Sequence, residues 1–138
     1  MMSRRELMAA LERQLIRDAG LSGADYQLLV PLSEAPDGLL RARDLGAMIG
    51  WERSRISHQV RRMAERGLLV REDCPEDARG AMIRLTDAGR AAIVGAAPNH
   101  VETVRSYFFD QLSANDVKTL GRICTRLLAQ LPKDRSAV

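Results

Sequence analysis

The chain is long enough for one domain with a real hydrophobic core, since 46% of its 138 residues are apolar. Its net charge of +3 balances 21 basic against 18 acidic residues, and nearly all the basic ones are arginine, which suits bidentate phosphate and guanine contacts. No apolar run is long enough to span a membrane and no secretory signal is evident, so we expect a cytoplasmic protein. The two cysteines lack zinc-site spacing, and reduced thiols are expected.

Two helices are predicted at the amino-terminal end. Across residues 4–16, leucine recurs at every fourth position, which indicates one apolar helix face. Residues 20–23, Gly-Leu-Ser-Gly, break this helix, and Ser22 or Asp25 can cap the next one. That second helix carries Tyr26 and three leucines.

A helix-turn-helix pattern follows. Residues 35–38, Ala-Pro-Asp-Gly, predict a turn. A brief strand at Leu39 and Leu40 follows, and then a short helix over residues 41–49. Gly50 supplies the tight turn into a second helix, about Glu52 to Arg66. This helix has an apolar stripe on one side and polar and basic residues on the other. The stripe is Ile56, Val60 and Met63, and the opposite side carries Arg53, Ser54, Ser57, His58 and Arg61.

Positive charge is concentrated in the same segment. From Arg41 to Arg71 there are eight arginines against three acidic residues, an excess of +5, so the remainder of the chain carries −2. A basic module on a slightly acidic body is typical of nucleic-acid-binding proteins, although exposed helices are often charged without binding anything.

A two-stranded hairpin is predicted after the basic helix. Residues 68–71 and 81–85 have the composition and alternation of strands, and residues 74–80 form a protruding loop between them. Thr86 then has the position of a cap that starts another helix.

Further helices are predicted towards the carboxyl end. Pro98 indicates a kink or a fresh helix start before residues 100–112, and Ser113 caps a last helix. The apolar stripe of that last helix has few partners in a domain this small, so the first and last helices are expected to pack in a dimer. We expect residues 133–138 to be disordered.

Three segments together resemble the MarR family of winged helix-turn-helix transcriptional regulators. They are residues 66–71 (Arg-Gly-Leu-Leu-Val-Arg), 77–80 (Asp-Ala-Arg-Gly) and 83–89 (Ile-Arg-Leu-Thr-Asp-Ala-Gly). Each fragment alone is weakly specific, whereas the ensemble is specific and the likeness covers nearly the whole chain. Ala78 departs from the pattern, because the family often has a basic or polar residue there. The expected fold is mainly α with a small two- or three-stranded β-wing.

The resemblance implies a homodimer that binds a pseudo-palindromic operator in double-stranded DNA. Residues 1–20 and 91–132 would supply the dimerisation helices, and residues 21–90 the DNA-binding domain. Two recognition helices would then lie about one DNA turn apart, roughly 34–36 Å. The implied function is that of a nucleoid-associated repressor without a cofactor. A small aromatic or phenolic effector would release it from DNA, and activation of transcription is left open.

The resemblance also assigns roles to individual residues. Arg79 matches the wing arginine that reaches into the minor groove, and Asp77, two positions earlier, would orient it. The expected major-groove and phosphate contacts are Arg53, Ser54, Arg55, Ser57, His58, Arg61 and Arg62. The analogous effector cleft would involve Tyr26, His100 or Arg105.

Other functions were weighed against this one. Ser54 and His58 are four residues apart, but no carboxylate is placed to orient the histidine, so we expect no enzyme. A redox switch would use Cys124, where packing on the apolar stripe is the simpler interpretation, or Cys74, expected to be the more exposed thiol. The remaining alternative is a winged-helix module that binds protein through the same basic helix.

Overall fold

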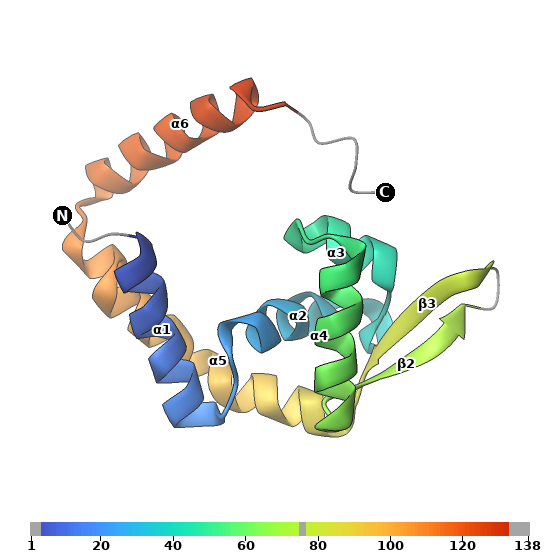
Figure 1. Cartoon of the computed structure of the whole chain (residues 1–138). Helices are drawn as coiled ribbons and strands as arrows, with labels where there is room; N and C mark the ends of the chain where they lie inside the picture. Colours follow the sequence, from blue (N-terminus) through green and yellow to red (C-terminus); the bar gives the residue numbers. More distant parts are fainter. Residues whose placement is uncertain (1–3, 75–76, 133–138) are drawn as a thin grey trace.

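The computed structural model describes residues 4–74 and 77–132, with the backbone alone for residues 77–79. The predicted disordered tail, residues 133–138, lies outside the described residues. The described chain is mainly helical with one small sheet, as predicted (Figure 1). Its elements are α1 (Arg4–Ala19), α2 (Gly23–Glu34), β1 (Leu39–Arg41), α3 (Ala42–Ile49), α4 (Arg53–Glu65), β2 (Leu69–Cys74), β3 (Asp77–Leu85), α5 (Asp87–Tyr107) and α6 (Ala114–Gln130), with single 3-10 turns at Pro36–Gly38 and Phe109–Gln111.

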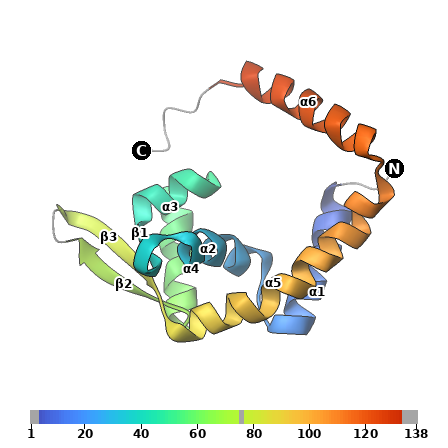
Figure 2. The same ribbon diagram turned by 180° about the vertical axis from the view of Figure 1, so that it is seen from behind.

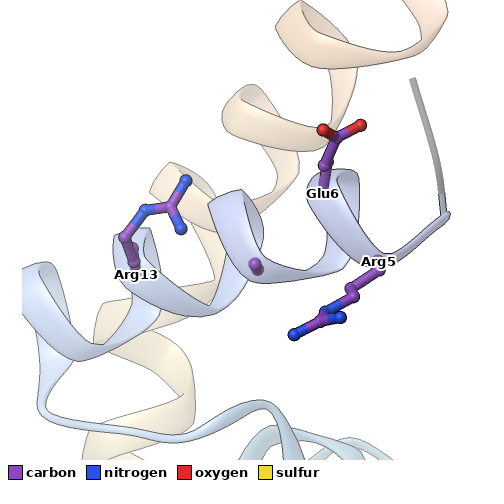
Figure 3. Close-up of a pocket in the computed structure, with 4 residues that line it drawn as sticks. Arg5, Glu6 and Arg13 are labelled. Carbon is purple, nitrogen blue, oxygen red and sulfur yellow. The ribbon is translucent and has the colours of Figure 1, made fainter. Parts of the chain in front are cut away.

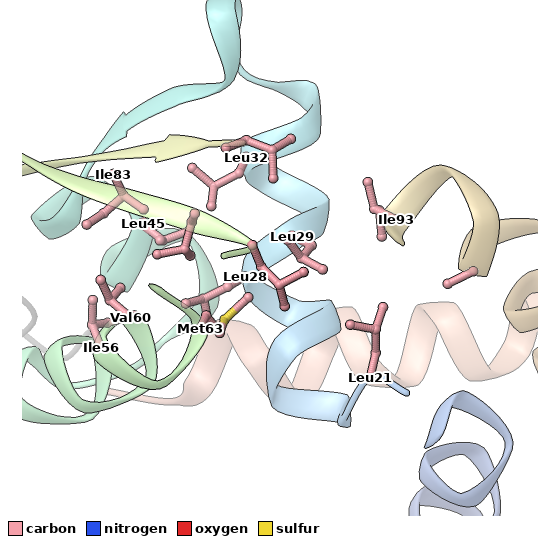
Figure 4. Close-up of a cluster of buried hydrophobic side chains, with 14 of the residues drawn as sticks. Leu21, Leu28, Leu29, Leu32, Leu45, Ile56, Val60, Met63, Ile83 and Ile93 are labelled. Carbon is pink, nitrogen blue, oxygen red and sulfur yellow. The ribbon is translucent and has the colours of Figure 1, made fainter. Parts of the chain in front are cut away.

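The hydrophobic core lies between α2, α3, α4 and the sheet (Figure 4). Leu28, Leu29 and Leu32 of α2 have no measurable exposure. The predicted stripe of α4 is confirmed as its buried face, which fixes the rotation of α4 about its own axis. At about 1.5–3 kcal/mol for each large apolar side chain buried, this packing is the main stabilising term of the winged domain.

The three strands form an antiparallel sheet in the order β1-β3-β2. Leu39 pairs with Arg84 and Leu69 with Leu85, and the β2–β3 register shifts between Asp73 and Cys74. The predicted loop over residues 74–80 is wrong in extent, since the hairpin continues to a Cys74–Asp77 pair. Backbone pairing extends the strands through polar sequence that the apolar alternation did not mark as strand.

The connection between β3 and α5 explains why residues 85–89 have the pattern Leu-Thr-x-x-Gly. The Thr86 hydroxyl donates to the Gly67 carbonyl oxygen at 2.6 Å and accepts from the Gly89 amide at 3.0 Å, so the predicted cap is confirmed. A Cβ at position 89 would overlap the carbonyl oxygen of Leu68. Glycine therefore allows the first turn of α5 to lie directly against the start of β2.

Helix α5 is continuous across Pro98, so a fresh helix start at this residue is wrong, and the helix ends at Tyr107. Proline removes one backbone donor, but Pro98 and Val94 are both exposed, and water can hydrate the carbonyl that is left free. The far half of α5 lies alongside α1, whereas α6 extends away from the rest of the chain (Figures 1 and 2). No residue of α6 is buried.

Candidate DNA-binding surface

The solvent face of α4 carries the candidate DNA-contacting residues. Arginine and serine donors follow one another along three turns of helix, a length of roughly 14 Å at 1.5 Å per residue. A helix of about 10–12 Å diameter, side chains included, fits the major groove of B-DNA, which is about 12 Å wide. The exposed candidates are Arg53, Ser54, Arg55, Ser57, His58, Arg61 and Arg62.

The amino-terminal end of α4 is open towards solvent. Its N-cap, Glu52, makes no side-chain capping hydrogen bond, and the first turn contains no acidic residue. The first backbone N–H groups of a helix lack intrahelical partners and carry the positive end of its dipole. This end of α4 therefore adds to the positive potential of Arg53 and Arg55.

Three of the candidate residues have partners within the chain. The guanidinium of Arg55 lies 3.8 Å from the ring centroid of Trp51, and Arg61 Nη2 lies 3.2 Å from His58 Nδ1. The second contact restrains two exposed side chains one turn apart on α4.

The wing is described only in part at the residues of interest. Asp77 and Arg79 belong to β3, but their side chains lie outside the described residues, so the predicted orienting contact stays a prediction. Nearer the core, Arg84 Nε donates to Glu72 Oε1 at 2.7 Å and Arg84 Nη2 donates to Glu72 Oε2 at 3.2 Å. The hydrogen bonds from Arg84 lower the pKa of the Glu72 carboxyl group.

A buried carboxylate fixes α4 to the start of α2. Asp25, whose side chain is 3% exposed, accepts from Gln59 Nε2 at 2.7 Å and from Arg66 Nη1 at 2.6 Å. Its Oδ2 also accepts from the Ser22 amide, and the Ser22 hydroxyl accepts from the Asp25 amide, a reciprocal cap. Because Arg66 also donates to the Gly20 carbonyl oxygen, the carboxyl end of α4 is tied to the α1–α2 junction.

Two of the three candidate effector residues meet at the junction of α2 and α5. The rings of Tyr26 and His100 are 4.4 Å apart between centroids, and His100 Nδ1 lies 3.0 Å from Gln14 Oε1. Burial raises the pKa of Tyr26 and lowers that of His100, because it disfavours the charged form of each. Both side chains are thus biased towards their neutral forms.

Arg105, the third effector candidate, is not in the contact between Tyr26 and His100. It is exposed and pairs with Glu102 at 3.1 Å. Arg105 and His100 nevertheless line one open hollow of about 330 Å³, whose other walls are apolar or aromatic: Val101, Val104 and Phe109. A larger hollow of about 440 Å³ lies along α1, lined by Arg5, Glu6, Ala9 and Arg13 (Figure 3). It contains none of the predicted effector residues.

The comparisons with known proteins agree with this arrangement. A MarR family model matches residues 19–80. A MarR family transcriptional regulator from Streptomyces coelicolor, solved in complex with DNA, is 41% identical, covers 94% of this chain and 81% of its own, and superposes with a TM-score of 0.88. The chain belongs to the MarR family.

Two further solved structures of transcriptional regulators from Streptomyces coelicolor are similar, and the first of them, AbsC, is a MarR family protein. AbsC is 36% identical over 91% of this chain and 87% of its own, with a TM-score of 0.82. PcaV, solved with its natural ligand, is 25% identical over 91% of this chain and 89% of its own, with a TM-score of 0.76. All three relatives are transcriptional regulators.

The cysteines of this MarR protein lie opposite to expectation. Cys74, expected to be exposed, is 6% exposed, because the paired strands extend to it and Arg41 covers it, with Nη2 3.1 Å from Sγ. Cys124, expected to be packed, is exposed, because nothing in the described chain covers α6.

Two other features of the described residues concern candidate functions. Among the side chains that the structure describes, no group of three metal-ligating residues lies together. Within the same part of the chain, no helix is both long and apolar enough to cross a membrane.

Sequence reasoning missed two groups of residues that support the α4 face. Trp51 was not among the predicted site residues, although its spacing of four residues from Arg55 is a signal for a contact between them. Gln59, a polar residue on the buried side of α4, could have indicated a buried polar partner, but its partner Asp25 is 34 positions away.

Proposed function

We propose that this protein is a homodimeric repressor that binds a two-fold symmetric operator and releases it when a small aromatic or phenolic anion binds. The observation that carries the proposal is the division of α4 into two faces. Ile56, Val60 and Met63 are no more than 2% exposed, whereas the arginine and serine face is entirely at the surface. A helix that is fixed by its buried face and carries basic residues on its exposed face has the features of a recognition helix.

The bases would be read by α4. Arg55 and its neighbours donate to guanine O6 and N7, and Ser54 and Ser57 to bases or phosphates. Arg61 and Arg62 neutralise phosphates and release counterions, which makes the affinity depend on salt. Arg79, oriented by Asp77, enters the minor groove, where narrow A·T tracts strengthen the negative potential.

The dimer would be formed by residues 1–20 and 91–132. Support comes from α6 and its C-cap residue Leu131, whose large apolar side chains are exposed in the single chain: Val117, Leu120, Ile123, Leu127, Leu128 and Leu131. An exposed stripe of this length on one helix indicates a protein partner, and a second copy provides an equivalent stripe. Residues 21–90 then form the DNA-binding domain on each side of the dimer.

The effector would bind where Tyr26 and His100 meet. Neutral aromatic rings and apolar walls suit an aromatic ring, and Arg105 supplies a cation for a carboxylate or phenolate. The effector releases DNA by favouring a different spacing of the two recognition helices, since a ligand shifts an equilibrium only by its differential affinity for the two states. Coupling energies of this kind are typically about 1–3 kcal/mol.

The decisive experiment is selection of binding sites from random duplex DNA with the purified protein at two salt concentrations. A palindrome enriched at both salts supports the dimeric regulator, because base contacts persist when phosphate attraction is screened. Enrichment of no sequence, with binding lost at high salt, contradicts it and favours a protein-binding module instead. Release of the selected duplex by a panel of aromatic carboxylates and phenols then tests the effector.

A further inference from the structure

Trp51 is held rigidly at the turn between α3 and α4. Its side chain is 8% exposed and belongs to the core cluster. Its backbone amide donates to the Gly46 carbonyl oxygen at 2.9 Å. A Cβ at position 46 would lie 3.1 Å from the Trp51 carbonyl oxygen, so the backbone at this turn is closely packed. The indole is therefore a fixed surface at the amino-terminal end of α4.

Arg55 lies on that surface. Its guanidinium carbon is 3.8 Å from the centroid of the Trp51 ring, well inside the roughly 6 Å reach of a cation–π contact. A distance this short indicates a contact through the face of the guanidinium group, because an N–H group pointed at the ring would hold the guanidinium carbon farther away. The N–H groups lie in the guanidinium plane and can still donate to a partner at its edge. Arg55 also lies in the first turn of α4, from which recognition helices contact base edges.

Other arginines of α4 are held differently. Arg53 and Arg62 make no ion pair or side-chain hydrogen bond to other side chains that the structure describes, and Arg61 contacts only the exposed His58. An arginine side chain loses rotamer entropy when it is immobilised. Stacking removes part of this loss before the partner arrives, and such preorganisation strengthens binding.

We propose that Trp51 is a positioning residue for Arg55, and that the stacked pair reads one guanine in each half-site. Trp51 holds the guanidinium in the plane that a bidentate contact to guanine O6 and N7 requires. Its influence on DNA binding therefore passes through Arg55 and is confined to one base pair. This inference rests on the proposed DNA-binding function.

The test measures base discrimination rather than affinity alone. Each base pair of the selected duplex is replaced in turn, and binding is measured for the wild type, Arg55→Ala, Trp51→Leu and the double variant. Arg55→Ala should abolish a preference of roughly tenfold or more for guanine at one symmetric position. Trp51→Leu should weaken the preference at that same position, leave the other positions and the salt dependence unchanged, and add nothing in the Arg55→Ala background.

Other outcomes overturn the inference. A uniform loss for every duplex, or an additive effect in the double variant, means that Trp51 supports only the fold. Trp51→Phe keeps an aromatic face and should retain most of the guanine preference. If Trp51→Leu does not fold, Trp51→Phe tests the inference instead. Its smaller loss of base preference must then be confined to the base pair that Arg55 reads. If the wild type selects no sequence at all, the proposed function fails instead, which is a distinguishable result.

Discussion

Helices α4 and α6 have the same kind of apolar periodicity and opposite surroundings. In α4 the stripe at Ile56, Val60 and Met63 is at most 2% exposed, because α2, α3 and the sheet cover it. In α6 Leu127 and Leu128 are 61% and 66% exposed, and nothing in the described chain covers them. Periodicity thus identifies an apolar face, but only the rest of the fold determines whether its partner lies in the same chain.

The largest expected effect follows from placing a charge on the uncovered face. Leu127→Glu puts a carboxylate into the proposed dimer interface, where it would be buried without a partner. We expect a monomer by light scattering, with affinity for a complete palindrome lowered about a hundredfold or more, since two linked binding domains gain about 10²- to 10⁴-fold over one.

Ala129→Glu is the matched control for this variant. It introduces the same charge on α6, two residues along and on the side of the helix opposite the leucine stripe. It should remain dimeric and bind the palindrome as the wild type does. Equal disruption by both variants would contradict an interface confined to the leucine stripe.

The next effect concerns the covered helix. Asp25→Ala removes the acceptor of Gln59 and Arg66 and half of the reciprocal cap at Ser22. Because Gln59 is buried and loses its partner while Arg66 is partly exposed and can be hydrated, we expect the free energy of unfolding to fall by about 3 kcal/mol. Chemical denaturation of the dimer measures it.

An exposed ion pair provides the comparison for the buried carboxylate. Glu72→Gln weakens the pair with Arg84, in which both side chains are about two-fifths exposed. Solvent screens this pair, so the loss of stability should be much smaller than that of Asp25→Ala. A loss as large as that of Asp25→Ala would mean that the buried network is not what fixes α4.

Predictability from sequence followed the distance between interacting residues. The caps at Ser22, Thr86 and Ser113 were found because each acts over three residues, and the α4 stripe because its period is local. The burial of Cys74 and the Asp25 network were missed, because each depends on residues 33 or 34 positions away. The extent of the wing was missed because its strands pair through polar sequence, although the paired residues are close along the chain. Buried polar partners leave no periodic signal, and strand pairing does not require apolar side chains.

A smaller effect is expected on DNA recognition than on dimerisation. Ser57→Ala or Arg79→Ala should weaken specific binding by about 1–3 kcal/mol through loss of a base contact, without altering the dimer or its melting temperature. Binding assays with specific and scrambled duplexes distinguish this from a general loss of affinity. Unchanged specificity in both variants would contradict the proposed contacts.

The smallest effect is a pH dependence of stability that arises where α5 meets α2, at His100 and Tyr26. Burial lowers the pKa of His100 from its ordinary 6.5, so the folded protein binds fewer protons than the unfolded chain as the pH falls through that value. Stability is then constant above about pH 7 and declines as the pH falls below 6.5 towards the lower, folded pKa. Melting temperatures between pH 7.5 and 5 measure the decline.

Two variants separate this decline from other titrations. His100→Phe keeps a ring against Tyr26 but cannot take up a proton, so the decline above pH 5 should shrink. His58→Gln removes the exposed histidine of α4 and should leave the decline unchanged. The carboxyl groups with lowered pKa near these elements, Asp18 and Glu72, lose their stabilising effect as the pH falls through and below their ordinary pKa values of 3.8 and 4.5, which lie below the measured range. If the melting temperature of His100→Phe declines as steeply as that of the wild type, protonation of buried His100 is not the cause of the decline.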